Sequence, residues 1–160
     1  MPDDLTITDA IVIRAPRATV FRALTDASEL AQWMATSAES DPRQGGQFRY
    51  VFEFDDPSQN NEQAGEYLEI VPDERVRLPW RFPFSPKATT VDYALDGDGS
   101  ETTVGFTHSG FEGGEPWDTA RARFGPGWRA FLEALKHWVE DRTPGRPLGI
   151  KGSTNGAGTS

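Results

Sequence analysis

The chain of 160 residues is long enough for one domain with a single hydrophobic core. Its net charge of −9 repels phosphate backbones and anionic lipid, so we expect neither a nucleic-acid partner nor a membrane partner. With two histidines and no cysteine, the sequence predicts no disulfide and no metal site.

Targeting and cofactor motifs are also missing from the sequence. There is no apolar run of about 18 residues, and the first ten residues have neither a basic region nor an apolar stretch. We therefore expect a cytoplasmic protein. No glycine-rich phosphate loop or nucleophile elbow occurs, so no cofactor is predicted.

The N-terminal part predicts one strand followed by two short helices. Residues 5–14 alternate apolar and polar side chains, as in a strand with one buried face. Pro16 suits the first position of a helix. Asp26, with Glu29 three residues later, is typical of a capping box that opens a second helix and places Trp33 on its inner side.

The middle of the chain predicts five more strands, because apolar residues recur with a period of two between turn-forming residues. These strands cover residues 45–56, 65–72, 74–84, 89–97 and 101–111. Pro79 suggests an edge or a bulge within its strand. Short connections favour antiparallel pairing, so we expect a curved antiparallel six-stranded sheet.

The stretch from 115 to 142 predicts a long amphipathic helix. Its large apolar residues fall in one stripe at roughly 100° per residue. The stripe contains Trp117, Phe124, Trp128, Phe131, Leu132, Leu135, Trp138 and Val139. The phase continues across Gly125–Gly127, which favours one helix bent at Pro126; two helices joined there are the alternative.

This helix is the only predicted element large enough to cover the sheet, so we expect an α+β fold in which the sheet grips the helix. The domain is expected to span residues 5–142. Residues 143–160 are rich in Gly, Ser and Pro, and we expect them to form a disordered, dispensable tail.

Several stretches, in order, resemble the family of activators of heat-shock protein 90 ATPase, within the START/SRPBCC helix-grip superfamily. The stretches are IRAPRATVFRALTD, LAQWM, GGQF, GEYLEIVPDERV, TVDYAL, TTVGFTHSGF and GWRAFLEAL. The resemblance implies the helix-grip fold and a cavity between the sheet and the last helix. It also implies a bacterial protein, because compact members of the family are mostly bacterial.

Ten side chains are candidates for ligand binding because the periodicity directs them inward. They are Trp33, Tyr50, Phe52, Glu66, Trp80, Tyr93, His108, Arg121, Phe124 and Trp128. The aromatic members are either cavity wall or ordinary core. Glu66 lies either in the cavity or at its rim, and Arg121 meets either an anionic partner, such as a ligand or Glu66, or solvent.

His108 shares its phase with Val104 and Phe106. It is either a polar anchor or proton shuttle, or a buried neutral histidine that hydrogen-bonds a carbonyl or tyrosine. Our first hypothesis is a monomeric or homodimeric, non-enzymatic binder of a small hydrophobic or aromatic molecule. The alternatives are an enzyme of the cyclase or aromatase type with His108 as its acid–base group, and a co-chaperone-like interaction module.

Overall fold

The structure of the protein is a computed structural model that describes residues 5–146 and Ile150. The elements follow the order β1 (Ile7–Ile13), α1 (Arg17–Thr25), α2 (Ala27–Trp33), β2 (Ser37–Ser40), β3 (Gln47–Phe52), the 3-10 turn η2 (Pro57–Gln59), β4 (Asn61–Glu66), β5 (Glu69–Val71), β6 (Arg75–Trp80), β7 (Thr89–Gly97), β8 (Thr102–Ser109) and α3 (Trp117–Asp141). The α+β class, the two short helices after the first strand and the long C-terminal helix are confirmed. None of the helices in the described residues is both long and apolar enough to span a membrane.

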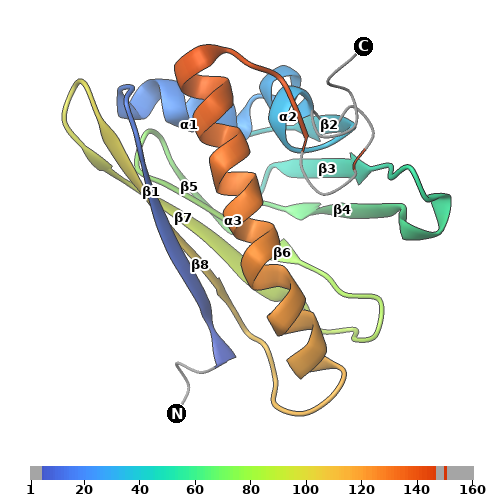
Figure 1. Cartoon of the computed structure of the whole chain (residues 1–160). Coiled ribbons are helices and arrows are strands. Elements are labelled where there is room, and N and C mark those ends of the chain that lie inside the picture. The colour runs from blue at the N-terminus through green and yellow to red at the C-terminus, as the bar shows by residue number, and fades with distance from the viewer. Residues whose placement is uncertain (1–4, 147–149, 151–160) are drawn as a thin grey trace.

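The strands form two antiparallel sheets that curve around α3, as Figure 1 shows. One sheet has the order β1-β8-β7-β6-β5 and the other the order β2-β3-β4. The predicted number of six strands was therefore too small. β2 was missed because its sequence, SAES, has no apolar alternation, and the run predicted over 65–72 is divided between β4 and β5.

The two sheets meet beside Pro79, on the side of β6 where β5 has ended. β5 pairs with β6 only from Arg75 to Arg77, which makes the position of Pro79 an edge, as predicted. The side chain of Gln63 on β4 replaces the missing strand pairing. Its Nε2 donates to the carbonyl of Arg81 at 2.8 Å, and its Oε1 accepts from the amide of Arg81 at 2.8 Å.

The inner face of the sheets and the apolar stripe of α3 form the core. The inward residues Val76, Leu78, Val91, Val104 and Phe106 are at most 2% exposed. α3 runs without interruption through Pro126, which confirms one helix over two. Its residues Trp117, Trp128, Leu132, Leu135 and Val139 are buried, as the phase predicted.

Helix α2 is tied to α3 by the residue expected to complete a capping box. Asp26 caps α2, and its carboxylate accepts from the amide of Ser28 at 2.8 Å. Glu29 does not complete the box. Its Oε1 accepts instead from Trp138 Nε1 at 2.9 Å and from Arg142 at 3.1 Å.

The chain after α3 packs against the domain at three described positions where we expected a free tail. The amide of Gly145 donates to the carbonyl of Gln32 at 2.9 Å. The guanidinium of Arg146 donates to the carbonyls of Ala31 and Ala35. Ile150 is 1% exposed. The rest of the predicted tail, residues 147–149 and 151–160, lies outside the described residues.

Candidate functional site

A cavity of about 840 Å³ lies between the N-terminal half of α3 and the ends of β3 and β6. Figure 1 shows α3 crossing the sheets there, with the β3–β4 hairpin on one side. Apolar lining residues are Phe52, Phe54, Trp80, Phe82, Phe84, Pro116, Ala120, Phe124, Pro126, Gly127, Trp128, Phe131 and Ile150. Polar lining residues are Gln59, Asn61, Glu115, Thr119 and Arg123.

Aromatic rings in edge-to-face and tilted contacts build the walls of this cavity. Trp80 and Trp128 lie with their ring centroids 4.9 Å apart at 69°, and Phe82 meets Phe124 at 4.9 Å and 73°. Phe52 contacts Trp80 at 6.0 Å. These are the arrangements that aromatic pairs prefer, so the wall residues stabilise one another by ring contacts.

Four of the ten predicted site residues line the cavity, namely Phe52, Trp80, Phe124 and Trp128. Trp33 lies instead in the core, where its Nε1 donates to the carbonyl of Ala23 at 2.9 Å. Tyr50 and Tyr93 are likewise buried away from the cavity, and burial raises the pKa of both phenols. None of these three residues lines the cavity, so they belong to the core.

Glu66 and Arg121 also lie outside the cavity lining. Glu66 is exposed, because β4 ends at that residue and the chain changes phase, so that Tyr67 is buried and Leu68 is 47% exposed. Arg121 neither meets Glu66 nor lines the cavity. Its guanidinium donates to Asp118 at 3.0 Å, one turn earlier on α3.

His108 is inward-facing, as its phase predicted, but both ring nitrogens are engaged within the core. Nδ1 accepts from Trp128 Nε1 at 2.9 Å, and Nε2 lies 2.7 Å from Thr89 Oγ1. Because an indole can only donate, the imidazole carries its proton on Nε2 and donates it to Thr89. Burial lowers the pKa of His108 to about 3, so it is neutral at physiological pH. It is the buried neutral histidine of our second interpretation, with partners other than those we expected.

The polar lining residues were missed by the sequence reasoning because they lie in turns, at the start of β4 and on the solvent side of α3. Glu115 is engaged locally, since its Oε1 accepts from Thr119 Oγ1 at 2.6 Å. Arg123 is exposed, and no hydrogen bond or ion pair joins it to another described residue. The sequence could have indicated the lining residues Phe82 and Phe84, because they continue the apolar alternation of β6 beyond Trp80.

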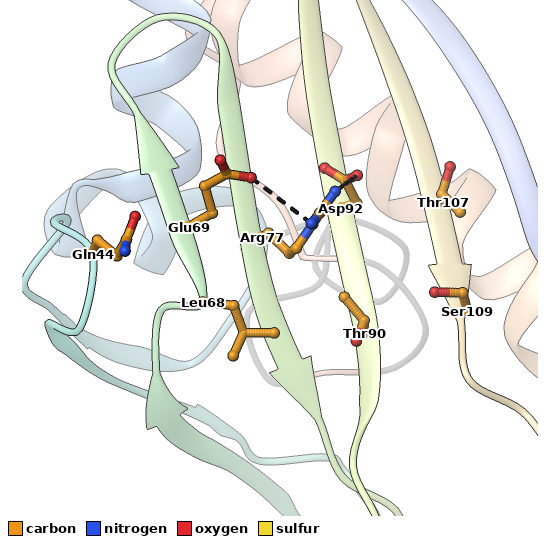
Figure 2. A pocket seen from close by; sticks show the side chains of 8 residues that line it. All are labelled: Gln44, Leu68, Glu69, Arg77, Thr90, Asp92, Thr107 and Ser109. Carbon is orange, nitrogen blue, oxygen red and sulfur yellow. Dashed lines mark hydrogen bonds and ion pairs between the residues drawn. The ribbon is translucent and has the colours of Figure 1, made fainter.

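A second hollow, of about 660 Å³, lies on the outer face of the larger sheet (Figure 2). Its charges compensate one another, since Arg77 lies 3.2 Å from Asp92 and 3.8 Å from Glu69. Leu68 is the single large apolar side chain among the described residues that line it. A paired, polar surface offers little to a small ligand, so the inner cavity is the candidate site. No cluster of metal-binding side chains occurs among the described residues.

The sheets that grip α3, with a cavity between them, define a helix-grip protein of the START/SRPBCC type. A sequence model of the activator of Hsp90 ATPase homolog 1-like proteins matches residues 14–140, and the chain belongs to this family. No match was found among curated proteins.

Solved structures of bacterial proteins share the fold. Protein MLL2253 from Mesorhizobium loti is 22% identical with a TM-score of 0.72, over 86% of this chain and 98% of its own. The Aha1 dimer from Colwellia psychrerythraea is 22% identical with a TM-score of 0.69, over 85% and 96%. Protein CV1439 from Chromobacterium violaceum is 28% identical with a TM-score of 0.65, over 86% and 98%.

Proposed function

We propose that the protein binds a small, largely apolar aromatic molecule in the cavity between α3 and the sheets. The observation that carries the proposal is the cavity itself. Its volume of about 840 Å³ lies within the range of small-molecule sites, which are about 300–1,000 Å³. Its lining has the usual composition of such sites, with aromatic walls and a few polar side chains.

Apolar burial supplies enough free energy for measurable binding. A ligand that removes about 200 Å² of apolar surface from water gains about 5 kcal/mol before the cost of association. Micromolar to millimolar dissociation constants are therefore expected for compounds the size of naphthalene.

Binding without catalysis is favoured over an acid–base enzyme by the position of His108. Both of its nitrogens are hydrogen-bonded, and the side chain is fully buried behind Trp128. A general acid or base needs to reach the reacting atom directly or through one water. His108 offers neither a free nitrogen nor a place in the cavity wall.

The remaining partner expectations stay predictions. One relative of the same fold is described as a dimer, which agrees with the expectation of a monomer or a homodimer. Sedimentation or light scattering of the full chain distinguishes the two. The absence of nucleic-acid and membrane partners rests on the net charge of −9.

The proposal is tested by filling the cavity from α3. Ala120 lines it, whereas Ala122 on the same helix is exposed and lies outside the lining. Binding of 2-naphthoic acid is measured by tryptophan fluorescence and by the rise in melting temperature. We expect Ala120→Leu to weaken binding at least fivefold and Ala122→Leu to leave it unchanged. Equal affinities of both variants and the wild type would show that the compound binds elsewhere. No response to any compound in a broad aromatic and acyl panel would overturn the proposal.

A further inference from the structure

The wall of the cavity is completed by a residue beyond the long helix. Ile150 lies against Phe54, with which it forms an isolated antiparallel bridge, and both side chains line the cavity. Ile150 is 1% exposed. Phe54 follows the end of β3, where its amide donates to Asn60 Oδ1 at 2.8 Å. This part of the wall is therefore made by two segments almost a hundred positions apart.

The described residues between α3 and this wall are anchored independently of the cavity. Arg142 ends α3 with a φ of 52°, and its guanidinium lies 3.1 Å from Glu29. Gly145 and Arg146 then bond to carbonyls at the end of α2. These contacts hold the chain over α2, on the side of the domain where β3 ends.

The family model matches residues 14–140, so Arg142, Gly145, Arg146 and Ile150 lie beyond the matched stretch. The cavity of this chain therefore includes a wall residue from outside that stretch.

We propose that Ile150 is a specificity-determining residue that limits the size of the ligand. The proposal rests on the proposed function, because it assigns a role within the same cavity. The side chain of Ile150 is buried in the wall, and a ligand larger than the cavity meets it beside Phe54. Shortening the side chain extends the cavity, and lengthening it reduces the cavity.

The first test compares 2-naphthoic acid with the larger pyrene-1-carboxylic acid in the full chain. We expect Ile150→Ala to raise the affinity for the pyrene compound at least fivefold relative to the naphthalene compound. Ile150→Phe should shift the ratio in the opposite direction. Ile70→Ala is the matched control, because Ile70 is half-buried on β5 and does not line the cavity. Its ratio should equal that of the wild type.

The second test needs no ligand and uses the absence of cysteine from the chain. In Ile150→Cys, the engineered thiol should react with an aromatic disulfide reagent at least tenfold more slowly than in Ser100→Cys, because Ser100 is exposed between β7 and β8. Equal rates would overturn the placement of Ile150 in the wall.

The outcomes separate the two proposals. If the wild type binds the naphthalene compound but the Ile150 variants keep its size preference, the inference about Ile150 fails and the binding function stands. If the wild type binds neither these two compounds nor any other in the broad aromatic and acyl panel, the proposed function fails, and the inference fails with it.

Discussion

Trp128 on α3 donates its indole proton to His108 on β8, with 2.9 Å between Nε1 and Nδ1. The other imidazole nitrogen bonds to Thr89 on β7, whose hydroxyl donates to the carbonyl of Trp80 at 2.8 Å. One line of hydrogen bonds therefore joins the helix to three strands. Because both tryptophans line the cavity, His108 orients part of its wall without belonging to it.

This arrangement predicts a stability that falls in acid. The pKa of His108 is about 3 in the folded protein and near 6.5 in the unfolded chain, so the unfolded state binds the proton first. Stability should decrease as the pH falls from about 6.5 toward 3, by up to about 1.4 kcal/mol per pH unit from this group. Urea unfolding at a series of pH values measures the slope.

The variant His108→Gln should be less stable than the wild type at pH 7 but should lose less stability between pH 6.5 and pH 4. His137→Gln is the control, since His137 is exposed on α3, and it should keep the wild-type slope. An unchanged slope in His108→Gln would mean that the imidazole is accessible to protons in the folded state.

Truncation of Leu135 tests how much the buried apolar stripe of α3 contributes to the stability of the fold. The side chain is fully buried, so Leu135→Ala should lower the free energy of unfolding by about 2–5 kcal/mol. His137→Ala should change it by no more than about 0.5 kcal/mol. Lys136 is not a neutral control, because its Nζ donates to the carbonyl of Val12 at 2.9 Å and to Glu140 at 2.8 Å. Similar losses in Leu135→Ala and His137→Ala would contradict the observed face of the helix.

Glu140 connects the end of α3 to the end of β1. Burial raises the pKa of its carboxyl, but hydrogen bonds from Lys136 and from the backbone and side chain of Arg14 outweigh this effect and lower the pKa to about 2. Glu140→Gln should therefore cost about 1.5–3 kcal/mol at pH 7. Because the folded pKa is lowered, the stabilisation is present above about pH 4.5 and is lost as the pH falls toward 2.

Chemical denaturation at pH 7 and at pH 2.5 tests this expectation. The difference between the wild type and Glu140→Gln should shrink at the lower pH. Glu133→Gln is the control, since Glu133 forms an exposed pair with Arg129 and should matter little at either pH. A difference that stays constant with pH would show that the amide changes the packing rather than the charge.

The position of Arg123 in the lining leads us to expect that the cavity prefers ligands with a carboxylate. Arg123 lines the cavity and has no bond to another described residue, whereas the net charge of −9 disfavours anions in general. A carboxylate preference must therefore come from a local cation. The wild type should bind 2-naphthoic acid several-fold more tightly than 2-naphthamide, and Arg123→Gln should remove this difference. Arg22→Gln, which removes the same charge from the exposed face of α1, should retain it. Calorimetric titration at low salt measures both ratios, and a preference that survives in Arg123→Gln would exclude this role.

The sequence by itself determined the family of this protein, its helices and most of its strands. Periods of 2 and 3.6 in the apolar residues predicted the strands and the helix that passes through Pro126, because a repeating pattern reports which side of an element is buried. The same periodicity predicted that Phe52, Trp80, Phe124 and Trp128 face inward, and all four line the cavity.

The tertiary structure decided which inward-facing side chains line the cavity and which pack against one another in the core. Periodicity places Trp33, Tyr93 and Phe124 equally inside, yet only Phe124 borders the cavity, because that depends on what lies opposite. The phase change after Glu66 comes from strand pairing, and the role of Ile150 comes from a contact with Phe54 across 96 positions. A local sequence pattern shows which face of a strand or helix is buried. It does not show which residues cover that face, because they come from distant parts of the chain.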